Sequence, residues 1–244
     1  MNSLKRLLAV ALRVLRQIKN DHRTIALMLV VPSLLTGLFS WMFNNPTQFN
    51  LVGPRLVGLF PFIVMFLLAS IGTLKERQSG TLERFLTTPM RKHEFILGYA
   101  LAFGFMAVIQ AAVTMNFAVY VLGLTLQDNY WTLMGAGIAN AILGMSLGLL
   151  ASAFAKTEFQ VIQFMPAFVF PQIILGGLFI PVAQMPDVLR SVSDWLPLTH
   201  SLKALNDIAV NAPTSDILTE IWVVVLVAVA ALLLGSLTLR KKTN

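Results

Sequence analysis

Long apolar segments without charge alternate with shorter polar segments along most of the chain. Each long segment approaches or exceeds the roughly 20 residues that a helix needs to cross a bilayer. This pattern predicts an all-α membrane protein in which residues 1–244 form a single transmembrane domain. The six predicted membrane-spanning helices are 25–43, 55–74, 95–124, 132–154, 159–180 and 221–239.

The segments before and between the first spans carry different signals. Residues 1–23 interleave leucine and valine with basic residues, which predicts an amphipathic helix lying in the membrane interface. A cleaved signal peptide is the alternative, but Arg13 and Arg16 interrupt its apolar region and no small-residue cleavage site follows. Residues 44–54 are polar and contain proline, so we expect a loop there, and residues 75–94 form a charged loop.

The fourth span contains small residues at regular spacing. Gly144 and Gly148 are four residues apart, so they share one helix face on which another backbone can approach closely. The same spacing occurs in transmembrane dimer seams, but we expect this pair to pack against a helix of its own subunit.

The fifth span and the segment after it are rich in proline. Pro166 and Pro171 lie inside the span and free backbone carbonyls that only neighbouring protein or a water-filled cavity can satisfy. In 182–216, apolar residues recur at helical spacing in two stretches that are too short to cross a bilayer: Leu189, Val192 and Trp195, then Leu202, Leu205 and Ile208. We therefore expect two short re-entrant helices that dip into the outer leaflet before the last span.

Composition excludes a soluble domain. Hydrophobic residues make up 57% of the chain and charged residues 12%, about half of the roughly 25% charged residues of an average soluble domain. The absence of cysteine excludes disulfides and thiolate chemistry. The sequence contains no Gly-x-x-x-x-Gly-Lys-[Ser/Thr] loop, so we expect no P-loop ATP site on this chain.

The net charge of +7 is distributed unevenly over the predicted loops. If the N-terminus is inside and the chain crosses six times, 15 of the 18 lysines and arginines lie on the inner side, and Arg55, Arg190 and Lys203 lie outside. Positive residues are retained on the cytoplasmic side of membranes. We therefore predict that both termini are cytoplasmic and that the basic charge reflects topology rather than nucleic-acid binding.

The charged loop contains a start signal and a stop signal for a short helix. The Thr81 hydroxyl can cap the first turn, Leu82 and Phe85 lie on one face, and Pro89 ends the helix. A basic loop is ordinary on the cytoplasmic side, so charge alone does not indicate a function. The more specific feature is the order of residues Glu76, Gly80, Thr81, Leu82, Glu83, Arg84 and Pro89.

This loop resembles the cytoplasmic coupling helix of ABC-2 type permeases, the membrane subunits of a class of ATP-driven exporters. A later segment is similar to the daunorubicin-resistance type of drug-export permease. Its matching residues are Glu158-Phe159-Gln160, Gln163-Phe164-Met165-Pro166, Pro171, Gly176-Gly177, Phe179-Ile180-Pro181, Met185-Pro186 and Trp195-Leu196-Pro197-Leu198-Thr199. Together with the basic N-terminal helix, the resemblance covers essentially the whole chain.

The resemblance implies a six-span half-transporter in a bacterial cytoplasmic membrane. It would dimerise, as a homodimer or with a sister permease, and dock a separate ATP-binding-cassette ATPase. That ATPase would hold ATP and Mg²⁺, and no cofactor is expected on this chain. The residues expected to couple the two subunits are Glu76, Gly80, Thr81, Leu82, Glu83, Arg84 and Pro89.

The apolar cores of the six predicted spans contain no charged residue. Proton- and ion-coupled carriers usually keep ionisable residues there, so we expect the energy to arrive from outside the membrane. A cavity lined by apolar residues and a few amides would suit a lipophilic substrate, either drug-like or lipid. The amides can instead make helix–helix hydrogen bonds. The candidates for the substrate path are Gln110, Asn116, Asn140, Gln163, Gln172 and Phe179.

Other function classes stay open on weaker signals. A membrane-embedded enzyme should show clustered histidines or acids at the membrane surface, but His22, His93 and His200 are scattered and have no metal-site spacing. The same architecture could export polysaccharide, peptide or ions, or the chain could be a sensing partner, as in bacteriocin-immunity systems. We predict no catalytic residues and no metal site.

Overall fold

The computed structural model describes residues 3–80, 92–125 and 129–238. All regular structure in these residues is helical, which confirms the predicted all-α fold. The elements are α1 (Ser3–Asn20), α2 (His22–Phe43), α3 (Pro46–Gln78), α5 (Lys92–Tyr120), α6 (Tyr130–Ser152), α7 (Glu158–Phe164), the π-helix η1 (Met165–Val169), α8 (Phe170–Leu175), the 3₁₀-helix η2 (Val182–Gln184), α9 (Asp187–Ser193), α10 (Pro197–Ala209) and α11 (Thr214–Thr238).

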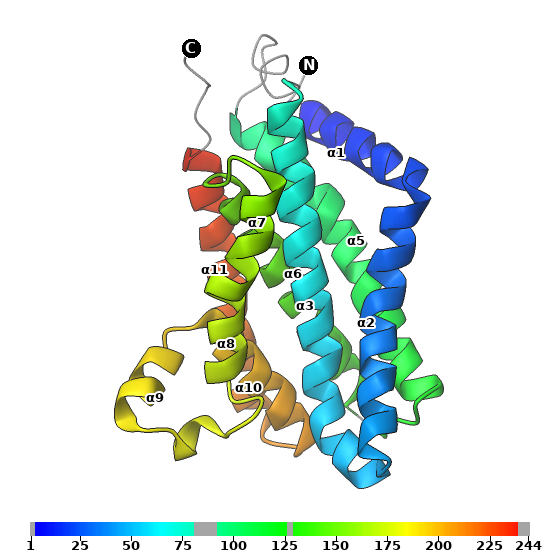
Figure 1. Cartoon of the computed structure of the whole chain (residues 1–244), viewed down its shortest axis with the longest axis vertical. Helices are drawn as coiled ribbons and strands as arrows, with labels where there is room; N and C mark the ends of the chain where they lie inside the picture. Colours follow the sequence, from blue (N-terminus) through cyan, green and yellow to red (C-terminus); the bar gives the residue numbers. More distant parts are fainter. Residues whose placement is uncertain (1–2, 81–91, 126–128, 239–244) are drawn as a thin grey trace.

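The helices form an elongated bundle with two different ends (Figure 1). α1 lies across one end, where α11 also finishes, and α9 and α10 lie at the opposite end; we call these the α1 end and the α9 end. Six helical segments among the described residues are long and apolar enough to cross a membrane, in agreement with the six predicted spans. They are His22–Phe43, Pro46–Gln78, Glu94–Tyr120, Tyr130–Ser152, Glu158–Leu175 and Thr214–Thr238.

α1 has two apolar faces with different surroundings. One packs on α5, where Gly98 leaves room for Val10: a Cβ on Gly98 would lie 2.7 Å from the Cβ of Val10. The other presents Leu4, Leu8 and Leu12, one turn apart, which are 65%, 42% and 54% exposed. A helix that lies across the end of the bundle with an exposed leucine stripe suits the predicted interfacial position.

The loop predicted at 44–54 is wrong, because α3 begins at Pro46. Asn44 takes a left-handed conformation that ends α2, and the Asn45 side chain accepts hydrogen bonds from the first-turn amides of α3. Proline is favoured at the first helical position, where its missing N–H costs nothing. Pro54 lies inside the helix, so the polar residues of this segment belong to its first turns and not to a loop.

The fifth predicted span, 159–180, is a helix of three parts that ends at Leu175. α7 passes into the π-helix η1, which contains Pro166, and α8 follows with Pro171 in its first turn. Both prolines therefore lie where the α-helical hydrogen-bond pattern is already changed. π-Helical segments are rare and often mark functional positions in helices.

Two short helices, α9 and α10, occupy the segment in which two were predicted, but they differ in burial. Leu202, Leu205 and Ile208 of α10 are buried. In contrast, Leu189 of α9 is exposed, and Trp195 lies beyond the end of α9 with 89% of its surface exposed. The helical spacing of 189–195 thus marks an outward-facing apolar surface rather than a core contact.

The central contact of the bundle is between α3 and α6. A Cβ on Gly144 would lie 2.9 Å from the carbonyl carbon of Phe62, and one on Gly148 would lie 3.1 Å from that of Phe66. In both cases the carbonyl oxygen would be closer still, so no larger side chain fits. The predicted packing of this glycine pair within its own subunit is confirmed.

Replacing Gly144 by valine should separate α3 from α6, because the new side chain would overlap the Phe62 backbone. Overpacking of this kind costs about 1–3 kcal/mol, which corresponds to a fall in Tm of about 3–9 °C for a chain of this size. The measurement is thermal unfolding of the detergent-purified chain followed by tryptophan fluorescence. Gly135→Val is the matched control on the same helix, because a Cβ there meets nothing within 4 Å; equal losses in both variants would contradict the proposed packing.

Candidate functional site

The last turn of α3 and the first turn of α5 flank the predicted coupling segment at the α1 end. Of its candidate residues, Glu76 and Gly80 lie among the described residues. Gly80 has a φ of 70°, a left-handed conformation that glycine adopts without strain, directly after the end of α3. The other candidates, Thr81, Leu82, Glu83, Arg84 and Pro89, lie outside the described residues.

Glu76 is buried against α1. Its two carboxylate oxygens accept hydrogen bonds from Nη2 of Arg13 at 3.2 and 3.1 Å, and only 5% of the residue is exposed. A buried carboxylate is costly unless it is paired, so the Arg13 guanidinium stabilises Glu76 in this position. The structure therefore places Glu76 in a contact within the chain that joins α3 to α1.

A second buried ion pair joins α1 to α5. Oε1 of Glu94 lies 3.0 Å from Nη2 of Arg6 and accepts a hydrogen bond of 2.6 Å from the Ser3 hydroxyl. Glu94 is 1% exposed. Arg6 and Arg13 are seven residues apart, so two turns of α1 present both guanidinium groups on one face. α1 is thereby fixed to the helices on both sides of the coupling segment.

The last turn of α3 also contacts the segment between α6 and α7. Arg77 donates to the carbonyl oxygen of Ser152, and Nε2 of Gln78 donates to that of Lys156 at 2.9 Å. Lys75 lies 3.8 Å from Glu158 at the start of α7, in an exposed ion pair. This single turn therefore links α1, α6 and α7.

The predicted substrate-path residues divide into two groups. Inside the bundle, Gln110 donates to the Met28 carbonyl at 3.0 Å, and Asn140 is fully buried without a hydrogen-bond partner among the described residues. Asn116, also on α5, is half-buried and accepts a hydrogen bond from the Tyr130 hydroxyl.

The second group lies on the outside of the α7–η1–α8 segment. Gln163 is exposed, Phe179 is 70% exposed, and half-buried Gln172 donates to the Phe168 carbonyl at 3.0 Å. One copy of the chain therefore does not gather the six candidates into one cavity. The described residues include no group of three or more His, Cys, Asp or Glu placed to hold a metal ion.

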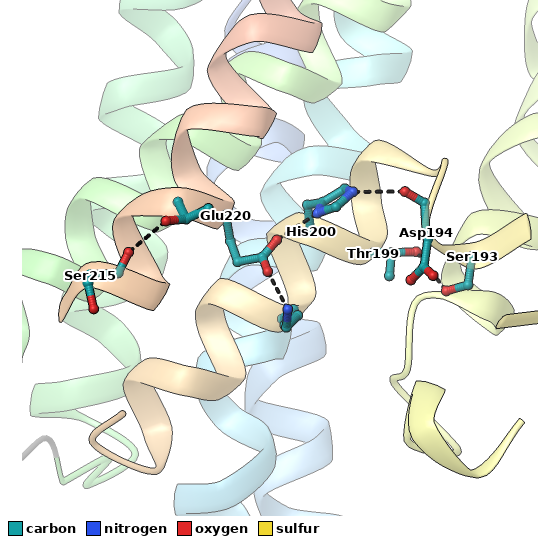
Figure 2. A network of polar contacts seen from close by, with 8 residues as sticks. Ser193, Asp194, Thr199, His200, Ser215 and Glu220 are labelled. Carbon is teal, nitrogen blue, oxygen red and sulfur yellow. Dashed lines mark hydrogen bonds and ion pairs between the residues drawn. The ribbon is translucent and has the colours of Figure 1, made fainter. Parts of the chain in front are cut away.

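A polar network at the α9 end joins α10 to α11 (Figure 2). Nδ1 of His200 lies 2.6 Å from a carboxylate oxygen of Glu220, and Nε2 lies 3.0 Å from the carbonyl oxygen of Asp194. A protonated imidazole donates from both nitrogens and so satisfies both acceptors. Lys203 donates to the second carboxylate oxygen of Glu220.

The sequence did not indicate the partners of Glu220, because this residue lies just before the predicted last span. α11 instead begins at Thr214, so Glu220 is part of the helix and only 7% of it is exposed. Histidine, lysine and glutamate at 200, 203 and 220 show no spacing that predicts a cluster. The close packing of α10 on α11 brings them together.

The family comparison matches residues 5–210 to the model of the ABC-2 type transporter. The chain is 26% identical over 194 residues to ABC transporter G family member 20 of Dictyostelium discoideum, covering 79% of this chain and 26% of the relative. It is 25% identical over 191 residues to the probable multidrug ABC transporter permease YbhR of Escherichia coli (strain K12), covering 75% and 50%.

A third relative is the linearmycin resistance permease protein LnrN of Bacillus subtilis (strain 168), which is 26% identical over 163 residues, covering 64% of this chain and 41% of the relative. The chain thus spans half or less of the length of these relatives. The matched region includes both ion pairs of α1 and the coupling segment between them.

Replacing Glu76 by glutamine should loosen α1, because Arg13 would lose its charged partner at a buried position. The expected cost to α1 docking is about 1–3 kcal/mol. Hydrogen–deuterium exchange of the α1 amides should rise by about tenfold, while exchange in the core of α6 stays unchanged. Glu158→Gln removes an exposed pair worth about 0–1 kcal/mol and serves as the control. Unchanged α1 exchange in Glu76→Gln would show that the ion pair does not hold α1.

Replacing Glu220 by glutamine should release α10 from α11 and lower Tm, because His200 and Lys203 both lose a charged acceptor. The hydrogen bond from Lys203 to Glu220 raises the pKa of Lys203 above its ordinary 10.5. The contact between Lys203 and Glu220 therefore contributes its full free energy of folding below pH 10.5. This contribution is lost as the pH rises through the raised pKa of Lys203. The native chain should therefore lose more Tm than Glu220→Gln as the pH rises above about 10.5. Asp187→Asn, at a 98% exposed carboxylate of the same end, should behave like the native chain.

Proposed function

The chain belongs to the ABC-2 type transporter family, and we propose that it forms one permease half of an exporter for a lipophilic, drug-like or lipid substrate. It is a membrane permease, and ATP is hydrolysed by a separate ATPase subunit. The observation that most supports coupling at the α1 end is the pair of salt bridges to buried carboxylates, Arg13–Glu76 and Arg6–Glu94. They brace the two helices that enter and leave the coupling segment.

The orientation proposed for this exporter has the α1 end in the cytoplasm of a bacterium. The charge distribution supports it, since the N-terminal helix and the coupling segment carry 11 of the 18 lysines and arginines. Two of these bases, Arg6 and Arg13, also neutralise buried carboxylates. The exposed bases Arg16 and Lys19 would then face the headgroups of the inner leaflet.

In the proposed mechanism, ATP binding closes the partner ATPases and displaces the segment from Gly80 to Pro89. Glu83 and Arg84 would make polar contacts with the ATPase. The last turn of α3 would transmit the displacement, because Glu76 connects it to α1 and Arg77 connects it to the end of α6. The bundle would then move as a nearly rigid body and open its path toward the α9 end.

A second copy of the chain would cover the exposed side of α7, η1 and α8. Phe159, Phe168 and Ile174 on this side are 68%, 62% and 58% exposed, and Gln163 is exposed among them. An amide inside a bilayer is costly unless protein or water satisfies it, so Gln163 favours a protein-lined path over lipid at this position. We propose a homodimer whose substrate path includes Gln163, Gln172 and Phe179.

The substrate class rests on composition and on the names of two relatives. The exposed side of α7–η1–α8 is apolar with few amides, which suits a lipophilic molecule. The Escherichia coli and Bacillus subtilis relatives are named for multidrug transport and for linearmycin resistance. The narrower similarity to daunorubicin-resistance permeases depends on the residues from Glu158 to Thr199.

The function is tested by co-purifying the chain with its partner ATP-binding-cassette ATPase and reconstituting both in liposomes. Lipophilic drugs should stimulate ATP hydrolysis and accumulate across the membrane only when ATP is supplied. Transport driven by an ion gradient, without nucleotide and without the second subunit, would overturn the proposal.

Glu83→Lys should uncouple the two subunits. We expect the variant to insert and to keep its Tm, while substrate-stimulated ATP hydrolysis falls by about tenfold or more, because a charge is reversed at the proposed contact with the ATPase. Asp187→Lys reverses a fully exposed charge at the α9 end and is the control that should leave hydrolysis unchanged. Normal ATPase binding and full transport by Glu83→Lys would remove Glu83 from the coupling contact.

A further inference from the structure

A cavity of about 540 Å³ lies at the α1 end, bounded by α1, α2, α3 and α5. Pockets of about 300–1,000 Å³ accommodate drug-sized molecules. Figure 1 shows α1 running from beside the upper end of α3 to the upper end of α2. Val14, Gln17 and Ile18 of α1 line the cavity. It is separate from the exposed side of α7–η1–α8, which carries Gln163 and Phe179.

The body of the cavity is apolar and opens at the surface of the bundle. Leu27 and Met28 of α2 face Val64, Leu68 and Ile71 of α3 across it. Met28 is buried, whereas Leu27 is 63% exposed and the three α3 residues are partly exposed. A hydrocarbon chain could therefore enter from the side, between α2 and α3, without crossing a polar layer.

The rim of the cavity at the α1 end is polar and predominantly acidic. Three carboxylates, those of Asp21, Glu76 and Glu158, line it together with the single base Lys75. Arg13 pairs with Glu76, and Lys75 pairs with Glu158 and also attracts Asp21. These three carboxylates are therefore matched by only two bases. Hydrogen bonds from Thr24 lower the pKa of Asp21, so this carboxylate is ionised at neutral pH.

The Tyr99 hydroxyl is a further polar group on the cavity wall. Tyr99 is 1% exposed, and its hydroxyl lies beside the Glu76 carboxylate and the Arg13 guanidinium without a hydrogen bond of ordinary geometry among the described residues. Buried hydroxyls are almost always hydrogen-bonded, so this group is available to a polar atom of a bound molecule.

We propose that this cavity binds an amphiphile that carries an amine, with the hydrocarbon part along α2 and α3 and the amine among the rim carboxylates. This inference rests on the proposed export function, for which the cavity would be the loading site. The excess of carboxylates over bases at the rim, where Asp21 and Glu158 share the single base Lys75, attracts the cationic amine, and the Tyr99 hydroxyl bonds a polar atom at the junction of head and tail. The exposed bases Arg16 and Lys19 of α1 do not line the cavity, so an anionic headgroup would meet carboxylates instead.

The amine could belong to a membrane lipid, such as phosphatidylethanolamine, or to a foreign alkylamine. The test uses the full chain in nanodiscs of phosphatidylglycerol, which carries no amine. The probes are a diazirine-bearing dodecylamine and the matched dodecanol, and cross-linked peptides are identified by mass spectrometry. We expect the amine probe to label peptides of α2 and α3 around Leu27 and Leu68 at least about threefold more than the alcohol does.

Two variants test the two halves of the site. Leu27→Trp fills the mouth of the cavity and should reduce amine labelling by about fivefold. Its control is Leu34→Trp, seven residues further on the same face of α2, at a 52% exposed position outside the cavity. Asp21→Asn with Glu158→Gln removes two rim charges and should lower amine labelling by about threefold without changing alcohol labelling. Asparagine retains the helix cap of Asp21, and Asp187→Asn controls for loss of a distant acid.

Competition identifies the source of the ligand. Added phosphatidylethanolamine that displaces the probe supports a lipid ligand, and displacement by unlabelled dodecylamine alone supports a foreign amphiphile. Equal labelling by amine and alcohol, or labelling that Leu27→Trp leaves unchanged, would overturn the proposal. The readout needs neither ATP nor the ATPase, so the cavity and the proposed export function can fail separately.

Discussion

The close approach of α3 and α6 at Gly144 and Gly148 is the constraint on which the other contacts depend. Lipid tails are as apolar as leucine, so helices inside a bilayer gain little from the hydrophobic effect and associate through close packing. Two glycines one turn apart bring backbone against backbone at Phe62 and Phe66. α3 then lies at the centre of the bundle, in contact with α2, α5, α6, α7 and α10, while α11 packs on α6 and α1 packs on α5.

Because α3 is held at its centre, its last turn is a fixed point at which several parts of the chain meet. That turn carries Glu76, Arg77 and Gln78, and each makes a polar contact with a different part of the chain. The contacts made by Glu76 and Glu94 are buried, and a buried ion pair adds little net stability but is costly to break on one side. The two α1 salt bridges therefore act mainly to fix geometry: they hold α1, α3 and α5 in one arrangement around the coupling segment.

The sequence was sufficient for the architecture but not for the contacts. Apolar runs of sufficient length predicted six spans, and the Gly144–Gly148 spacing predicted close packing. The loop at 44–54 was wrong because Asn45 and Pro46 form a helix start whose signal the polar residues obscured. The partner of Glu76 could not be predicted, because the sequence shows where the charged residues lie along the chain but not which helix packs against each of them. The same limit applies to the network at Glu220.

α7 connects the proposed loading cavity with the proposed path between two copies. Its first residue, Glu158, borders the cavity and pairs with Lys75, while Gln163, more than one turn further, lies on the exposed side. Directly after α7, the π-helix η1 breaks the regular hydrogen-bond pattern, so α7 is not rigidly continuous with α8. A displacement of the last turn of α3 would therefore move α7 first, through Lys75 and through the contact of Gln78 with Lys156. One helix of seven residues therefore borders both the cavity and the proposed path.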